Sequence, residues 1–153
     1  MDEARELKVA SRTGTLLGSM SKVMGETQYA DDLSLPRMLY CRILRSTHPH
    51  AKISAIDTSR ALKRKGVLAV ITGKDLPIPY GILPVSQDEE ALCVEKVRMV
   101  GDPVAAVAAL DEETAEAALE DIRVEYEPLP TVMSVQEGLA ETDAQIHEYA
   151  DQG

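Results

Sequence analysis

The fold is decided by residues 101–109, GDPVAAVAA, and by residues 111–119, DEETAEAAL, which follow almost at once. The first stretch opens with turn-forming residues and continues with small apolar ones, which predicts a turn and then a buried strand. The second stretch begins like a capped helix, because Asp111 offers a side-chain oxygen to the free N–H groups of a first turn. One face of this helix is predicted to be apolar, and it carries Ala115, Ala118, Leu119 and Ile122.

Local sequence patterns in the rest of the chain predict the other helices and strands. Strands are predicted at residues 38–44, 52–56, 67–71 and 122–127, a short helix between residues 59 and 65, and a last helix beginning at Ser134. Alternation places Leu39, Cys41 and Ile43 on one face of the first strand. Two helices each lie between two strands, which is typical of crossover connections. The predicted fold class is α+β, with a mixed β-sheet and flanking helices.

The ends and one internal segment differ in composition from the rest. Residues 1–20 are predicted to form an extended or disordered arm, residues 21–139 the folded domain, and residues 140–153 an acidic tail leading to a next domain. Residues 73–93 are interrupted by proline and glycine and are predicted to be irregular. Their apolar side chains, expected to pack on the domain or on a partner, are Tyr80, Ile82, Leu83 and Val85.

The charge and the cysteines narrow the class of protein. Twenty-six acidic residues against 16 basic ones give a net charge of −10, which disfavours binding to nucleic acid or to an anionic membrane surface. No apolar run approaches the roughly 20 residues of a membrane span, and residues 1–5 show no signal-peptide character. Cys41 and Cys93 are expected to be reduced, which predicts the cytoplasm.

Histidines and a cysteine offer the first candidates for chemistry. His48 and His50 suggest a metal site, but the third histidine, His147, lies in the acidic tail, so a solvated turn is the preferred interpretation. Cys93, followed by Glu95 and Lys96, could be a nucleophile. Cysteine catalysis needs an activating base close in space, and an inert thiol is preferred.

Two further patterns have structural explanations. Residues 101–103 precede a strand and lack the glycine spacing of a phosphate loop, so a tight turn is predicted there. The carboxylates on the 111–121 helix are expected to form a solvated face, and they are Glu112, Glu113, Glu116, Glu120 and Asp121. No catalytic, cofactor-binding or metal-binding residue is therefore predicted.

Several segments in order resemble one family. They read KVMGETQYADD (residues 22–32), RILRSTHPHAKI (42–53) with IDTS (56–59), GVLAV (66–70), GDPVAAVAA (101–109) and VEYEPLP (124–130). This series resembles the N-terminal α/β hammerhead domain of the molybdenum-binding large chain of the xanthine dehydrogenase and aldehyde oxidase family. Residues 79–85 and 88–98 look most like the 4-hydroxybenzoyl-CoA reductase type. Ser19-Met20-Ser21 and Met24 depart from the family pattern, which leaves the local geometry of the arm open.

The resemblance implies a structural domain or subunit of a molybdopterin-dependent oxidoreductase, a hydroxylase or dehydrogenase, that packs against cofactor-binding domains and an iron–sulfur partner. The chain itself would hold no cofactor. The full enzyme would contain molybdopterin and 2Fe-2S clusters, and the resemblance leaves open whether it also contains FAD. The alternative is a free-standing binding or regulatory domain without catalysis.

Overall fold

The computed structural model describes residues 18–81, 88–140, 144, 146 and 147. The chain divides into two compact units, Met1–Pro36 and Arg37–Gly153. In the first unit, a five-residue helix, α1 (Ser19–Val23), precedes a 3-10 turn, η1 (Ala30–Asp32). The backbone N–H of Tyr29 donates to the Asp32 carboxylate at 2.8 Å and thereby caps this turn.

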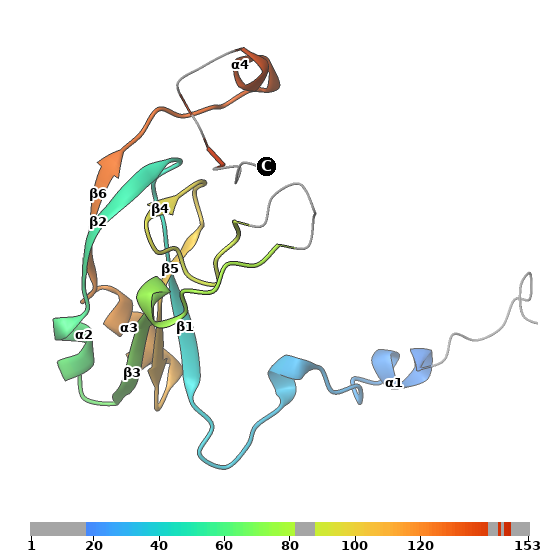
Figure 1. The fold of residues 1–153 in the computed structure, drawn as a ribbon. Coiled ribbons are helices and arrows are strands. Elements are labelled where there is room, and N and C mark those ends of the chain that lie inside the picture. Colours follow the sequence, from blue (N-terminus) through green and yellow to red (C-terminus); the bar gives the residue numbers. More distant parts are fainter. Residues whose placement is uncertain (1–17, 82–87, 141–143, 145, 148–153) are drawn as a thin grey trace, which may run out of the picture. The chain divides into compact units, whose positions relative to one another are not determined.

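The second unit is built on two three-stranded sheets (Figure 1). In the first sheet, β1 (Tyr40–Arg45) and β3 (Val67–Thr72) flank β5 (Pro103–Ala109). In the second, β4 (Lys96–Val97) and β6 (Arg123–Pro128) flank β2 (Ala51–Asp57). All four strand pairings are antiparallel. The helical elements of this unit are α2 (Ser59–Lys63), η2 (Gly73–Asp75), α3 (Glu112–Leu119) and α4 (Val135–Leu139).

The α+β class is confirmed, but the prediction of crossover connections is wrong. The two strand–helix–strand segments, β2–α2–β3 and β5–α3–β6, each begin in one sheet and end in the other. The helices of five and eight residues span roughly 7–12 Å. A strand of seven residues extends about 23 Å, so neither helix carries the chain back to the start of the preceding strand. The chain therefore passes to the other sheet.

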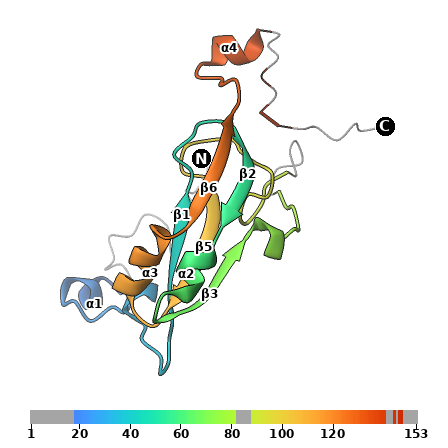
Figure 2. The same cartoon turned by 90° about the vertical axis from the view of Figure 1, so that its left-hand side faces the viewer.

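The core lies where β5 meets α2 and α3. Ala105 and Val107 on β5 pack with Ala61 of α2 and Ala118 of α3, and all four are fully buried. Both views show α2 and α3 on the same side of β5 (Figures 1 and 2). The predicted buried strand and the apolar helix face are thus confirmed. The small side chains allow the close approach of helix and sheet.

The opposite face of the first sheet is open. Cys41 and Ile43 share a face, as alternation predicts, because they pair with Ala108 and Ala106 across β5. Both side chains are exposed, so this face of β1 is not part of the core. Leu44, the next residue along β1, lies on the other face of the strand and packs against the core.

Residues 73–93 are irregular at their described ends. After η2, Tyr80 and Glu89 exchange backbone hydrogen bonds of 2.8 and 3.0 Å, and Leu92 and Cys93 are buried. Three of the four apolar side chains predicted to pack there, Ile82, Leu83 and Val85, lie outside the described residues. None of the helices in the described ranges is both long and apolar enough to cross a membrane.

Candidate functional site

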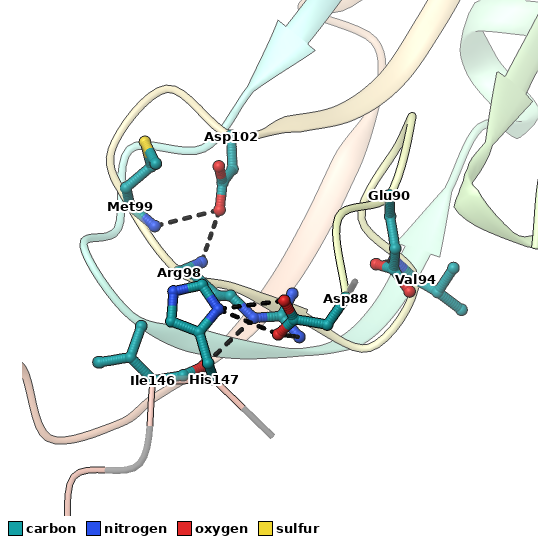
Figure 3. A network of polar contacts seen from close by, with 8 residues as sticks. All are labelled: Asp88, Glu90, Val94, Arg98, Met99, Asp102, Ile146 and His147. Carbon is teal, nitrogen blue, oxygen red and sulfur yellow. Dashed lines mark hydrogen bonds and ion pairs between the residues drawn. The ribbon is translucent and has the colours of Figure 1, made fainter. Parts of the chain in front are cut away.

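A polar network joins residues 88–102 to residues 146 and 147 (Figure 3). Arg98 and His147 both point toward the carboxylate of Asp88. An Arg98 guanidinium nitrogen lies 3.3 Å from Asp88 Oδ2, and His147 Nδ1 lies 3.0 Å from the same oxygen. Arg98 also donates from Nε to the Ile146 carbonyl at 3.2 Å. The network fastens residues 146 and 147 to the segment before β5.

Opposing effects set the pKa of Asp88. Burial raises this pKa, whereas the hydrogen bond from His147 and the charge of Arg98 lower it, and the result is a pKa below the usual value. The carboxylate is therefore ionised at neutral pH. A carboxylate held by an arginine and a histidine side chain is suited to joining segments rather than to accepting a proton from a substrate.

The turn before β5 is organised by Asp102. Its Oδ2 accepts the backbone N–H groups of Arg98 at 2.6 Å and Met99 at 3.1 Å. Gly101 has a φ of 99°, which glycine adopts without strain, and its N–H donates to the Ser46 carbonyl at 2.8 Å. The predicted tight turn at residues 101–103 is confirmed. The Asp102 carboxylate accepts hydrogen bonds from backbone N–H groups of the same turn and thereby stabilises it.

The three histidines make separate contacts. The His48 ring lies against the Tyr126 ring, with centroids 4.5 Å apart, and His147 binds Asp88. His50 is buried rather than solvated, and its Nδ1 lies 2.6 Å from the Pro130 carbonyl, to which it must donate. The description of His50 as part of a solvated turn is thus wrong. Within the described ranges, no three His, Cys, Asp or Glu side chains are grouped as metal ligands.

Cys93 is a buried thiol. Burial, and then the negative charges of Asp102 and Glu90, raise its pKa to about 12. The thiolate is the reactive form of cysteine, so this residue is a poor nucleophile at neutral pH. The preference for an inert thiol agrees with this environment.

The acidic helix face is only partly solvated. Glu112 pairs with Arg42 of β1. Asp121 is buried, and its two oxygens accept from Arg60 at 3.1 Å and from Arg64 at 2.7 Å. The prediction of a purely solvated face is therefore wrong for Asp121, because α2 brings two arginines over the end of α3. Sequence spacing could not reveal an ion pair across 57 positions.

Two hollows border these residues, and neither suits the implied cofactors. One of about 190 Å³ is lined by Asp88, Glu90 and Glu95 together with Pro79, Lys96 and Arg98. The other, of about 60 Å³, lies between β2, η2 and Cys93. Both are smaller than the roughly 300 Å³ at which ligand pockets begin, and three carboxylates disfavour an anionic cofactor. An iron–sulfur cluster needs four ligands such as cysteine thiolates, and the chain has two cysteines.

Comparison with known proteins identifies longer relatives of this chain. A probable xanthine dehydrogenase subunit of Bacillus subtilis (strain 168) is 49% identical over 129 residues, covering 83% of this chain and 17% of that protein. The Nicotinate dehydrogenase large molybdopterin subunit of Eubacterium barkeri is 36% identical over 94% of this chain and 34% of its own length. The chain thus spans about a third or less of these relatives.

A solved structure has the same fold as this chain. The solved Aldehyde Oxidoreductase from Desulfovibrio gigas (MOP) superposes with a TM-score of 0.77 at 36% identity, over 85% of this chain and 16% of that one. Residues 24–130 match the family described as "Aldehyde oxidase and xanthine dehydrogenase, a/b hammerhead domain". The match spans more than half of the 153 residues and includes both sheets. The chain therefore belongs to the aldehyde oxidase and xanthine dehydrogenase family, and it carries that family's α/β hammerhead domain.

Proposed function

We propose that this chain is the N-terminal structural domain, or a separate subunit, of a molybdopterin-dependent oxidoreductase. The observation that carries the proposal is the hammerhead match over residues 24–130. The chemistry of the described residues agrees with a scaffold, since Cys93 is a thiol with a raised pKa and Asp88, Asp102 and Asp121 are engaged in structural contacts. The domain itself supplies no catalytic, cofactor-binding or metal-binding residue in this proposal.

The proposed partners are the cofactor-binding domains of the large subunit and an iron–sulfur partner, in the cytoplasm. Molybdopterin supplies the redox chemistry when it is bound elsewhere in the assembly, with 2Fe-2S clusters and FAD as further carriers. Residues 21–139 are the folded domain in this proposal, and residues 140–153 lead toward the next one. The Arg98–Asp88–His147 contact holds residues 146 and 147 of that tail against the domain.

The substrate is proposed to be a 4-hydroxybenzoyl-CoA-type thioester. Support comes from the resemblance of residues 79–85 and 88–98 to that type of enzyme. The relatives described above act in other systems, such as nicotinate dehydrogenase, so this refinement is tested separately from the family role.

Purification of the chain from its source cells tests the family role. An affinity tag is placed on the chain, the protein is isolated under native conditions, and molybdenum and iron are measured per mole of chain. We expect both metals in the native protein and neither in the 153-residue chain produced alone. Absence of molybdenum from the native protein would favour the free-standing alternative. Turnover of 4-hydroxybenzoyl-CoA by the native protein, compared with nicotinate and xanthine, tests the substrate.

A further inference from the structure

His50 fastens the chain where it leaves the second sheet. Its ring is only 3% exposed, and Nδ1 donates to the Pro130 carbonyl at 2.6 Å. The backbone carbonyl of His50 accepts the Leu129 N–H at 3.0 Å. One residue just before β2 thus holds two successive residues just after β6. These two contacts, here called the His50 clamp, extend the pairing of Ala51 with Pro128.

The His50 clamp requires one tautomer of the neutral ring. A carbonyl oxygen only accepts hydrogen bonds, so the ring hydrogen must be on Nδ1. Nε2 is then a bare acceptor, and it is buried without a hydrogen-bond partner among the described residues. Buried polar atoms in folded proteins usually have a partner. This nitrogen is therefore a point at which the clamp is sensitive to a change in the ring.

Protonation changes what the ring requires. The imidazolium has two N–H donors and a positive charge. Pro130 satisfies the donor on Nδ1, whereas the donor on Nε2 would be buried with no acceptor among the described residues. A buried charge without a partner is much more unfavourable than a buried neutral polar group. The closed clamp therefore disfavours the protonated ring, and an open clamp, in which water reaches the ring, accepts it.

The charges on the neighbouring segments do not compensate for the second donor. The titratable and charged side chains on these segments are His48 in the same turn, Lys52 on β2, Lys96 and Arg98 at β4, and Tyr126 and Glu127 on β6. The His48 ring lies against the Tyr126 ring, and Arg98 is paired with Asp88. None of these groups accepts a hydrogen bond from Nε2 of His50. Cations outnumber carboxylates among them, which further disfavours an imidazolium in the closed clamp.

We propose that His50 is a proton-operated clamp, which holds residues 129 and 130 beside β2 when its ring is neutral and releases them in acid. The ring takes up a proton from water as the clamp opens. Residues after Pro130 lead to α4, so opening frees the connection between the second sheet and that helix. Opening becomes easier as pH falls below about 6.5, the ordinary pKa of an imidazole, because only the open clamp readily binds the proton. The inference is independent of the proposed function, since every contact lies within the Arg37–Gly153 unit.

The Leu129 amide reports on the clamp directly, because it donates to the His50 carbonyl. Its protection from hydrogen exchange is measured by NMR in the 153-residue chain at about pH 7.5 and about pH 5, relative to an unstructured peptide at each pH. The Leu110 amide, which donates to the Gly66 carbonyl at 2.9 Å, is the control for a backbone hydrogen bond elsewhere. Nitrogen chemical shifts of the His50 ring at the higher pH identify the tautomer. His50→Asn is the matched variant, because its side-chain amide keeps a donor near the position of Nδ1 and does not titrate.

We expect the protection of Leu129 to fall at least about tenfold at the lower pH in the wild type, and by less than about threefold in His50→Asn. The protection of Leu110 should stay the same. The double variant His48→Gln/His147→Gln, which leaves His50 as the only histidine, should behave like the wild type. Unchanged protection of Leu129 in the wild type would overturn the proposal, as would equal losses at Leu129 and Leu110 or a ring hydrogen on Nε2 at the higher pH. If His50→Asn does not fold, the tautomer and the double variant still decide the question.

Discussion

At the scale of single residues, Gly73 is fixed by the backbone of another segment. A Cβ at this position would lie 2.5 Å from the Cys93 carbonyl oxygen and 2.6 Å from that of Leu92. Gly73→Ala should therefore lower the free energy of unfolding by about 1–3 kcal/mol, because backbone rather than a flexible side chain must move. Thermal or urea unfolding measures the change.

Gly138→Ala is the matched control for that substitution. Gly138 lies within α4, where an added Cβ would lie 3.4 Å from a Val132 methyl group, an ordinary contact. Alanine favours a helix over glycine, so this variant should be as stable as the wild type or slightly more stable. If both variants behaved alike, the close approach of residues 73 and 93 would be wrong.

Asp121 gives a prediction about pH. The hydrogen bond from Arg64 lowers its pKa, burial opposes this effect, and the charges of Arg64 and Arg60 lower the pKa further. A pKa that is lower in the folded than in the unfolded state contributes stability at pH values above about 4, and this contribution is lost as pH falls through the folded value. Asp121→Asn should thus melt below the wild type at pH 7, and the difference should shrink as pH falls below the ordinary carboxyl pKa of about 4.

Glu116→Gln provides the comparison on the same helix. Glu116 is exposed on α3, so its substitution should change the melting temperature less than Asp121→Asn at pH 7. A difference between Asp121→Asn and wild type that persisted unchanged at low pH would show that the charge of Asp121 is not what stabilises the contact with α2.

Single residues were also where the sequence was least informative. The turn at residues 101–103 is local, so its glycine and aspartate predict it well. The partners of Asp121 and His147 lie 57 to 61 positions away in the sequence. The periodicity of apolar residues predicts helices and strands, but it does not predict which distant segments are in contact. Burial of His50 against Pro130, 80 positions away, escaped prediction for the same reason.

At the scale of elements, β5 presents different environments on its two faces. Ala105 is fully buried against the helices, whereas Ala108 lies on the open face and is only partly buried. Ala105→Leu should overpack the core and cost about 1–3 kcal/mol of unfolding free energy. Ala108→Leu should change it by about 0.5 kcal/mol or less in the chain alone. Equal losses in chemical denaturation would mean that both faces are filled in the chain alone.

Element types followed from the sequence, whereas their pairing did not. Alternation and capping residues predicted β1, β2, β3, β5, β6 and α3 with small errors at the ends. The two-residue strand β4 is too short to leave a periodic signal, and it was missed. Which sheet a strand joins depends on the length of the connecting helix relative to the length of the preceding strand. Local sequence patterns predict each element separately and do not compare these lengths.

At the scale of the Arg37–Gly153 unit, the central strand and the 73–93 segment should differ in local stability. β5 is hydrogen-bonded to β1 and β3 on its two edges and is largely buried. The described ends of the segment are held by the Tyr80–Glu89 pair, while Ile78 is 77% exposed. An isolated pair of backbone hydrogen bonds opens more readily than a central strand. Amide exchange should therefore be slow at residues 104–108 and much faster at Ile78, Tyr80, Gly81 and residues 88–90 in the chain alone.

The same measurement on the molybdenum-containing protein separates the two functional hypotheses. If partner domains pack on this segment, the amides of residues 78–81 and 88–90 should become protected there, while those of β5 change little because they are already slow. Burial of exposed side chains such as Ile78 and Tyr80, roughly 1.5–3 kcal/mol each when complete, supplies the free energy for this ordering. Strong protection of these amides already in the chain alone would show that the segment is stabilised by its own domain. That result would favour a free-standing domain over a subunit of a larger enzyme.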